Sequence, residues 1–404
     1  MVVGDRQEGC EALIALHLYG DVLETVVERL PVADLAATAV VSREWLSAVR
    51  SVLRRRPRRL PWLVVHFLGR RRLTAAYDPH SGAWLTVHAA PRNGTPSSAV
   101  RQVRSASGDR ICELSLSGLD IAGDALGTSA RIAVKAPGVC RVDPVFAVVG
   151  DRVIALGGAC HLALAEGENA AAVEVHEGGI WAACDPVPPA LRESASATWL
   201  SAAATDQRVY LTERTTGWAS WFDPAKRRWG PTRLLRPDVG VSTWAIAPGR
   251  AGAERLLLFG AKREGQGAEK RVVVQTWEVD GDALDLSRGT TRDAMPSEMS
   301  EVLFPGDEDQ DGEEIFPSIG VCGNATGGYV YNAAEPANGA VLYDLRRGGK
   351  GSGAVDRWER VPCVPAARAE PLGRVILACS PVGLDELPGG LRPLGSQLPR
   401  TDAH

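Results

Sequence analysis

The sequence predicts a small all-α unit of three helices followed by an all-β propeller of six blades. Apolar residues recur at helical spacing within residues 22–53, whereas from Pro61 onward short apolar runs alternate with turn residues. Tryptophan also recurs in similar surroundings along the chain, and its 11 copies outnumber the six tyrosines and six phenylalanines. Recurrence at a spacing of tens of residues is typical of a repeat fold.

Size and composition narrow the class of protein. The 404 residues exceed the usual single-domain size, so we expect one large repeat domain or two or three domains. A net charge of −4 gives no general attraction to nucleic acid or to a membrane. No signal or transit peptide and no run of about 18 apolar residues is readable. The eight cysteines form no Cys-x-x-Cys pair, which favours reduced thiols in the cytoplasm or nucleus over a zinc site.

The helical segment comes first. Its opening part, VLETVVERL, is ended by Pro31 and places four apolar side chains on one helical stripe: Leu23, Val26, Val27 and Leu30. A second short helix is expected over residues 33–40. Ser42 can cap a third helix, whose apolar residues recur every four positions as Trp45, Val49 and Leu53.

Strand and turn signals follow. LTAAYDPHSGAWLTV reads as strand, turn and strand, and ASWFDPAKRRWGP is a near copy of it. In both, an aromatic residue precedes Asp-Pro, and a tryptophan, Trp84 or Trp229, stands six residues after the aspartate. The aspartate can bond the backbone ahead of it and the proline presets φ, so the pair favours a turn. Burial of the tryptophan is worth about a few kcal/mol, so the repeat needs no ligand to explain it.

Weaker copies fill the remaining chain. They surround Trp181, Trp277 and Trp358, and a unit without tryptophan is expected at residues 109–137. Six units of three or four strands would form a ring, because a single small sheet cannot cover both of its faces. The strand at residues 374–380 is expected to pair with residues 61–67 and close the ring. An inner apolar strand ending near glycine is expected in four units, at residues 152–158, 208–213, 255–260 and 327–332.

One segment interrupts the repeats. RDAMPSEMSEVLFPGDEDQDGEEIF begins as one or two helical turns and then carries six acidic residues and no basic residue in the insert 305–314. A loop this long and acidic is functional or mobile. We interpret it as an exposed loop, and the alternative is that it recognises a basic surface of a target.

The N-terminal residues resemble an F-box. The matching features are Leu18, Gly20-Asp21-Val22-Leu23, Leu30-Pro31, Asp34-Leu35, Val41-Ser42, Arg43, Trp45 and Leu46. With the repeats behind them, the chain from about residue 16 to 387 resembles the plant F-box/kelch-repeat family, which implies a three-helix F-box and a kelch-type β-propeller. Tyr19 departs from the family's usual proline, and the double glycine of kelch blades is clear only at Gly157-Gly158. The expected boundaries are a disordered N-terminus at 1–15, the F-box at 16–58, the propeller at 61–387 and a disordered tail at 388–404.

This resemblance implies a non-catalytic subunit without a cofactor: the substrate receptor of an SCF (Skp1, cullin, F-box) ubiquitin ligase. The F-box would bind a Skp1-type adaptor and through it cullin, while the propeller would hold a protein target for ubiquitination and proteasomal degradation. Some members of this family act on enzymes of flavonoid and phenylpropanoid synthesis, and the phrases LHLYGDVLE and LPWLVVH most resemble the member that acts on chalcone synthase. The adaptor-facing surface would comprise Leu18, Leu23, Leu30, Pro31 and Leu35, with Trp45 and Leu46 shared between that surface and the helical core.

Three other groups of residues could indicate a different function. The arginines between residues 54 and 59 could bind nucleic acid or act as a nuclear signal, but a solvated helix end is preferred. No two of the seven histidines form a pair at metal-ligand spacing, which disfavours a copper oxidase; His66, His88 and His176 are expected in strands and His80 in a turn. Cys160-His161 lacks an Asp or Asn to orient the histidine as a catalytic base. The alternatives to the ligase receptor are a propeller scaffold and a metal oxidase.

Overall fold

The structure is a computed structural model, and it contains two compact units, residues 1–57 and 58–404. Each unit is described by itself. The described residues are 20–30, 32–55, 60–68, 72–87, 101–106, 108–126, 131–160, 171–250, 254–265, 271–286, 293–305, 317–345, 358–364, 374–381 and 392–393.

The first unit is a bundle of three short helices, as predicted. They are α1 (Gly20–Arg29), α2 (Val32–Ala39) and α3 (Arg43–Arg55), and both α1 and α2 pack on α3. Ser42 caps α3, because its hydroxyl oxygen accepts the Trp45 backbone N–H at 3.4 Å and donates to Glu44 at 2.6 Å. The core of the unit consists of Leu23, Val27, Leu35, Ala48, Val49 and Val52.

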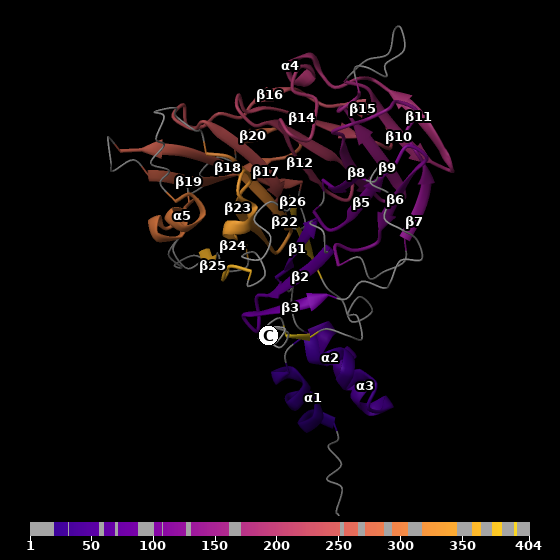
Figure 1. The fold of residues 1–404 in the computed structure, drawn as a ribbon, viewed down its shortest axis with the longest axis vertical. Coiled ribbons are helices and arrows are strands. Elements are labelled where there is room, and N and C mark those ends of the chain that lie inside the picture. The colour runs from indigo at the N-terminus through magenta and orange to yellow at the C-terminus, as the bar shows by residue number, and fades with distance from the viewer. Residues whose placement is uncertain are drawn as a thin grey trace, which may run out of the picture. The chain divides into compact units, whose positions relative to one another are not determined.

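The second unit is a propeller of six antiparallel sheets, which confirms the predicted fold (Figure 1). Blade 1 combines strands from both ends of the chain: β26 (Arg374–Ser380), β1 (Trp62–Leu68), β2 (Arg72–Asp78), β3 (Ala83–Val87) and β27 (Arg392–Pro393). Blade 2 holds β4 (Arg101–Arg104), β5 (Ile111–Leu114), β6 (Gly118–Ala122) and β7 (Arg131–Lys135), and blade 3 holds β8 (Val145–Val149), β9 (Arg152–Leu156), β10 (Val173–Glu177) and β11 (Ile180–Cys184).

The remaining blades follow in chain order. Blade 4 holds β12 (Leu200–Ala204), β13 (Val209–Glu213), β14 (Trp218–Asp223), β15 (Arg228–Trp229) and β16 (Arg233–Leu234). Blade 5 holds β17 (Thr243–Pro248), β18 (Arg255–Glu264), β19 (Arg271–Asp280), β20 (Asp285–Leu286) and β21 (Asp293–Ala294). Blade 6 holds β22 (Ile319–Asn324), β23 (Gly327–Asn332), β24 (Val341–Asp344) and β25 (Trp358–Arg360). Short helices precede β12, follow β21 and follow β23: α4 (Pro189–Arg192), α5 (Ser297–Leu303) and η3 (Pro336–Asn338).

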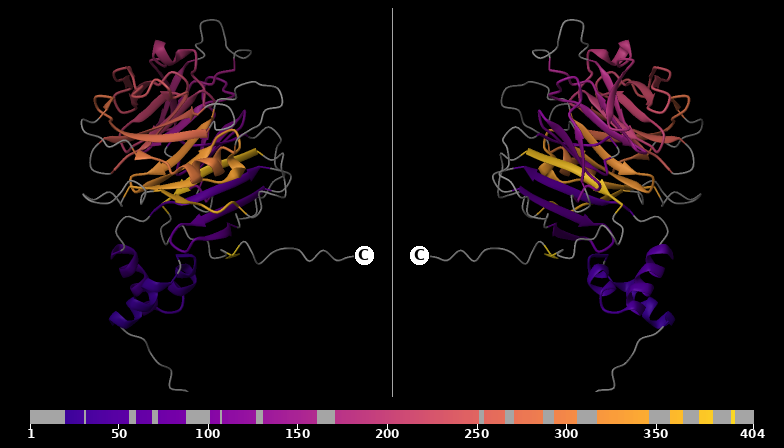
Figure 2. Two further views of the ribbon diagram at one scale, coloured as in Figure 1. Left: turned by 90° about the vertical axis from the view of Figure 1, so that its left-hand side faces the viewer. Right: turned by 90° about the vertical axis from the view of Figure 1, so that its right-hand side faces the viewer.

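The ring closes as predicted, through the pairing of the last long strand with the first. β26 runs antiparallel to β1 from the pair Trp62 and Ser380 to the pair Leu68 and Arg374 (Figure 2, yellow beside indigo). β26 is therefore the innermost strand of blade 1. The other innermost strands are β4, β8, β12, β17 and β22, and each contacts its neighbours around the centre.

The predicted inner strands take the second place in their blades, and this corrects the sequence interpretation. β9, β13, β18 and β23 each lie between an innermost strand and a third strand. A second strand is covered on both faces by neighbouring blades, so its sequence is as apolar as that of an innermost strand. The unit predicted at residues 109–137 without tryptophan forms most of blade 2.

Tryptophans join neighbouring blades. Trp84 packs on Tyr77 and Trp229 on Phe222, with ring centroids 5.3 and 5.1 Å apart. The indole N–H groups of three outer strands donate to backbone carbonyls of the preceding blade: Trp84 to Pro362 at 3.0 Å, Trp181 to Lys135 at 2.8 Å and Trp229 to Asp185 at 3.0 Å. The repeated tryptophan therefore has a structural role, in agreement with the prediction.

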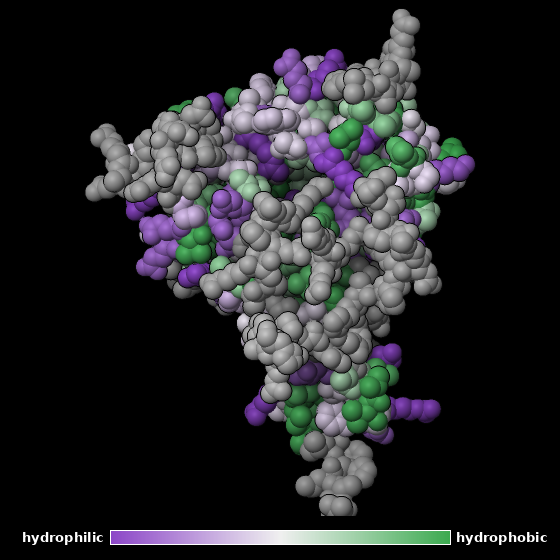
Figure 3. Space-filling view, in the orientation of Figure 1, coloured by the Kyte–Doolittle hydropathy of each residue, from purple (hydrophilic) through white to green (hydrophobic). Residues whose placement is uncertain are grey.

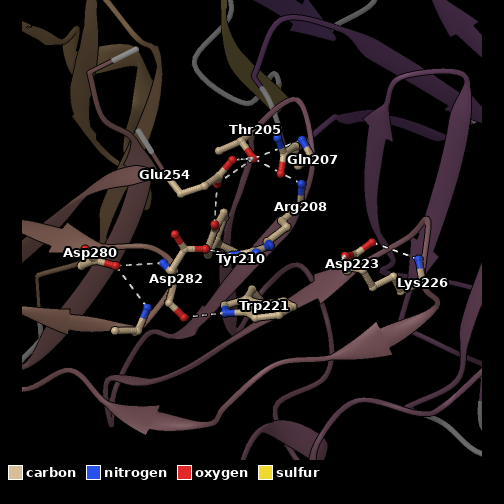
Figure 4. A network of polar contacts seen from close by, with 11 residues as sticks. Thr205, Gln207, Arg208, Tyr210, Trp221, Asp223, Lys226, Glu254, Asp280 and Asp282 are labelled. Carbon is tan, nitrogen blue, oxygen red and sulfur yellow. Dashed lines mark hydrogen bonds and ion pairs between the residues drawn. The ribbon is translucent and has the colours of Figure 1, made fainter. Parts of the chain in front are cut away.

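A polar network links blades 4 and 5 (Figure 4). The hydroxyl groups of Tyr210 and Thr205 donate to the Glu254 carboxylate, at 2.5 Å for Tyr210. Arg208 pairs with Asp282 at 2.5 Å and lies over the Trp221 ring, 4.0 Å from its centroid. Thr205, Arg208 and Glu254 lie in the turns after the innermost strands β12 and β17, and Asp282 lies in the outer hairpin of blade 5. Tyr210 and Trp221 lie on β13 and β14.

The structure also bears on the predicted C-terminal boundary of the propeller and on the acidic segment. Arg392–Pro393 pairs with β3, so the sheet extends past the predicted boundary at residue 387. The edge of β3 offers unpaired backbone groups, and a proline is compatible with an edge strand. The helical start of the acidic segment is confirmed as α5, whereas residues 306–316 lie outside the described residues.

Candidate functional site

The predicted adaptor-facing residues separate into two groups in the helical unit. Leu23 and Leu35 are core residues, with 2% and 0% of their surface exposed, so they can support a partner surface only by holding the helices together. Leu30, Trp45 and Leu46 keep part of their surface accessible. Leu18 and Pro31 lie outside the described residues.

Other apolar side chains of the helical unit are more exposed than those predicted. Val22 on α1 is 58% exposed, and Val40 and Val41, between α2 and α3, are 83% and 64% exposed. Apolar residues are visible on the face of these helices in Figure 3 (green). The helical stripe of α1 does not include Val22, and Val40 and Val41 lie in a turn, so helical periodicity gives no signal for them.

The propeller has a central cavity of about 390 Å³. Among the described residues its wall comes mainly from the innermost strands: from β4 and the two residues after it, and from the beginnings of β8, β12 and β26. Tyr331, at the end of β23, and Arg214, directly after β13, also line it. Central cavities of this size in ring-shaped folds are suited to binding a ligand or part of a partner.

One wall of the cavity carries an ion pair. Arg101 on β4 donates to the Asp143 carboxylate at 2.8 Å. The same carboxylate accepts the backbone N–H and the hydroxyl group of Thr198, at 2.8 and 2.6 Å. Asp143 is thereby held between blades 2 and 4.

The double glycine that the sequence marked lies beside this pair. Gly157 and Gly158 have φ values of 54° and 63°, and a Cβ on Gly158 would lie 2.1 Å from the carbonyl group of Asp143. Gly158 N–H also donates to the Ala195 carbonyl at 2.6 Å. Only glycine allows this close approach of backbones, which places Asp143 in the cavity wall.

The other wall carries Arg104 and Arg214. The Arg104 Nη1 group donates to the carbonyl oxygens of Val321 and Leu377, at 2.8 and 3.3 Å, and to the Tyr331 hydroxyl oxygen at 3.1 Å. The Arg214 Nη1 group donates to the Ile319 carbonyl at 2.8 Å. Sequence reasoning missed both arginines, because the partners of Arg104 lie more than 200 positions away along the chain.

Those of the candidate catalytic and metal-binding residues that the structure describes are not gathered into one site. His66 is a buried residue of β1, His80 is exposed in the turn after β2, and His176 lies in β10, as predicted. Cys160 is partly buried, and His88 and His161 lie outside the described residues. Within the described ranges, His, Cys, Asp and Glu side chains form no cluster of three or more suited to a metal ion. No helix in those ranges is long and apolar enough to cross a membrane.

Comparisons with known proteins agree with the geometry. The F-box domain family matches residues 16–56. An F-box/kelch-repeat protein of Arabidopsis thaliana is 31% identical over 385 residues, which cover 91% of each chain.

Solved structures are more distant. A protein of unknown function from Bacteroides caccae has 11% identity and a TM-score of 0.37, over 71% of this chain and 90% of that one. Hydrazine synthase of Kuenenia stuttgartiensis has 10% identity and a TM-score of 0.35, over 72% and 83% of the two chains. Similarities this weak carry no argument about function.

Proposed function

This chain belongs to the F-box/kelch-repeat protein family, and we propose that it is the substrate-recognition subunit of an SCF-type ubiquitin ligase. The observation that carries the proposal is one chain with an F-box and a separate six-bladed propeller. In this role the F-box binds a Skp1-type adaptor, and through it cullin, while the propeller binds a protein target in the cytoplasm or nucleus.

The chain contributes proximity rather than chemistry in this role. A receptor that holds its target beside the charged ubiquitin-conjugating enzyme raises the effective concentration of the target's lysines. Ubiquitin transfer is then carried out by other subunits, and the receptor needs no catalytic residue, cofactor or metal.

The adaptor surface is proposed to combine the predicted residues with the exposed valines. Leu30, Trp45 and Leu46 offer partly accessible apolar surface, and Val40 and Val41 extend it, together with Leu18 and Pro31 from the predicted set. Leu23 and Leu35 hold the helices in place beneath that surface. Burying exposed valine and leucine surface against a partner is worth about 25 cal/mol per Å².

Co-purification with Skp1 tests this proposal. Full-length chain is expected to retain Skp1, whereas residues 58–404 alone and the double variant Val40→Asp, Val41→Asp are expected to lose it. The matched control is the double variant Leu116→Asp, Val239→Asp, because these propeller residues are 86% and 82% exposed and their change adds the same two negative charges elsewhere. If full-length chain retains no Skp1, the chain is a propeller scaffold and the ligase role is wrong.

For the target we propose an enzyme of flavonoid or phenylpropanoid synthesis, with chalcone synthase as the specific candidate. This proposal depends on the resemblance of LHLYGDVLE and LPWLVVH to family members that act on such enzymes. Loss of this protein is expected to lengthen the half-life of chalcone synthase in a cycloheximide chase. An unchanged half-life and level of the enzyme would contradict the proposal.

A further inference from the structure

The central cavity has an excess of positive charge. Among the described residues that line it, the charged groups are Arg101, Arg104, Arg214 and Asp143. Arg101 and Asp143 neutralise one another at 2.8 Å. Two guanidinium groups are therefore left without a carboxylate partner in the described part of the chain.

Arg104 and Arg214 also keep unused donors. Their hydrogen bonds to described residues are all donated by Nη1 and accepted by neutral oxygens. The Nη2 groups donate to no described residue. Both residues keep part of their surface accessible, and both line the cavity.

The two guanidinium groups are close enough to repel each other. Burial is the main cause that lowers the pKa of Arg214, and the charge of Arg104 also lowers it, against the opposing effects of Tyr331 and Glu213. Arginine nevertheless stays protonated near neutral pH, so both charges persist. A buried charge without a counter-ion is costly to a fold, which makes the pair a candidate for binding an anion.

The chemistry of the wall suits an oxyanion. Guanidinium groups bind carboxylate and phosphate through paired N–H donors, in short charge-assisted hydrogen bonds. Tyr331 accepts from Arg104 through its oxygen, so its O–H proton is left to donate to the same ligand. A cavity of about 390 Å³ admits an acidic side chain and a short stretch of the peptide that carries it.

We propose that Arg104 and Arg214 bind a carboxylate or phosphate group on an acidic peptide segment of the target, which enters the central cavity. This deepens the proposed function and depends on it for the assignment of the ligand to a target protein. Glutamate, aspartate and phosphoserine side chains share the required chemistry, and the experiment below separates them.

Binding of degenerate peptide libraries tests the proposal. Seven-residue fluorescent peptides with a fixed central glutamate, phosphoserine or glutamine are incubated with full-length chain, and the bound fraction is measured by anisotropy. We expect the glutamate or the phosphoserine library to bind about tenfold or more tightly than the glutamine library, and to weaken as salt is raised. The library that binds more tightly shows whether the anion is a carboxylate or a phosphate group.

Variants locate the site. Arg214→Gln gives up one hydrogen bond to a neutral carbonyl and is expected to lower the affinity for the acidic peptides about tenfold or more. Arg104→Gln is expected to do the same, but it also removes bonds to two blades, so Arg214→Gln decides the outcome if Arg104→Gln unfolds. Arg233→Gln is the matched control, because Arg233 is exposed on β16 outside the cavity and the net charge changes equally.

Several outcomes would overturn the proposal. One is that the glutamine and acidic libraries bind equally well. Another is that a folded Arg214→Gln variant binds the acidic peptides as tightly as the parent. The third is that the chain binds inorganic phosphate but no acidic peptide. Skp1 co-purification is measured on the same samples. If the chain binds acidic peptides but does not retain Skp1, the ligase role is contradicted and the cavity assignment still holds. If the chain retains Skp1 but does not bind acidic peptides, only the cavity assignment is contradicted.

Discussion

At the scale of single residues, His66 shows how burial fixes a protonation state. The ring lies in β1, with Nε2 2.7 Å from the Ala125 carbonyl and Nδ1 3.0 Å from the Thr74 hydroxyl group. A carbonyl only accepts, so Nε2 carries the proton and Nδ1 accepts from Thr74, which is the neutral form. Burial lowers the pKa of His66 to about 4, against weaker opposing effects of the Ala125 bond and nearby acidic groups.

Propeller stability is therefore expected to fall as pH falls from about 6.5 to about 4. In that window the unfolded chain binds a proton that the folded chain does not, which costs up to about 3 kcal/mol. The His66 contribution is fully present above pH 6.5. Urea unfolding at pH 7 and pH 4.5 should show a smaller difference in His66→Gln than in the parent, while His80→Gln, in an exposed turn, should match the parent. An identical pH dependence in His66→Gln would contradict the assignment.

Gly158 is required by its contact with Asp143, where a Cβ would lie 2.1 Å from the carbonyl group, and its φ of 63° also favours glycine. We expect Gly158→Ala to lower the free energy of unfolding of the propeller by at least about 2 kcal/mol, from backbone strain and overpacking together. Gly150→Ala is the matched control, since Gly150 has a φ of 62° but nothing within 4 Å of its Cβ position. Equal losses in both variants, measured by urea unfolding, would show that the contact with Asp143 is unimportant.

At the scale of elements, the sequence predicted what is local. Each Asp-Pro turn is readable because its bonds lie within three residues: the Asp223 carboxylate accepts the backbone N–H groups of Ala225 and Lys226, both at 3.0 Å. The carbonyl that receives the Trp229 indole belongs to another blade, 44 positions away, and no local pattern marks it. The four apolar strands predicted as inner strands take the second place in their blades, and the sequence could not show this, because first and second strands are both covered on two faces.

In the helical unit, too, local sequence patterns predict the elements but not the role of each residue. Leu23, which is buried, and Leu30, which keeps part of its surface accessible, lie on the same predicted stripe, so periodicity alone could not separate them. Arg104 and Arg214 were not predictable either, because only the closed ring brings them to one cavity. A local sequence pattern cannot predict site residues whose role depends on strands that are distant along the chain.

The core position of Leu35 leads to a prediction for the helical unit. Leu35→Ala is expected to destabilise this unit by about 2 to 5 kcal/mol, because the side chain is fully buried. Limited proteolysis should cut residues 1–57 faster and Skp1 retention should fall, while the melting temperature of the propeller stays the same. Val22→Ala, which shortens an exposed side chain of α1, is the control and should leave proteolysis unchanged. A Leu35→Ala chain as resistant as the parent would place the helical core elsewhere.

At the scale of the whole molecule, the closed ring makes the propeller depend on its C-terminal strand. β26 supplies the innermost strand of blade 1 and contacts the innermost strands β4 and β22 of the neighbouring blades. Its removal would expose the edge of β1 and uncover two neighbours at once. In a closed ring, no other strand can replace the contacts that β26 makes, so its loss leaves the ring open.

Deletion of residues 374–404 is therefore expected to abolish cooperative unfolding of the propeller and to cause aggregation. Deletion of residues 394–404, which keeps β26 and β27, should leave the melting temperature within about 2 °C of the parent, because no described contact is lost. Differential scanning calorimetry of the two truncated chains measures both outcomes. Cooperative melting of the shorter chain at the parental temperature would contradict closure by β26.

The central claim is that one chain carries a target on its propeller and recruits the ligase through its F-box. The most direct measurement is proximity labelling by full-length chain and by residues 58–404, followed by the half-lives of the proteins that both forms label. We expect at least one shared protein to be degraded faster when the full-length chain is present, with a half-life restored by residues 58–404 or by proteasome inhibition. If every shared protein keeps the same half-life with both forms, the chain binds proteins without directing their degradation, and the claim is wrong.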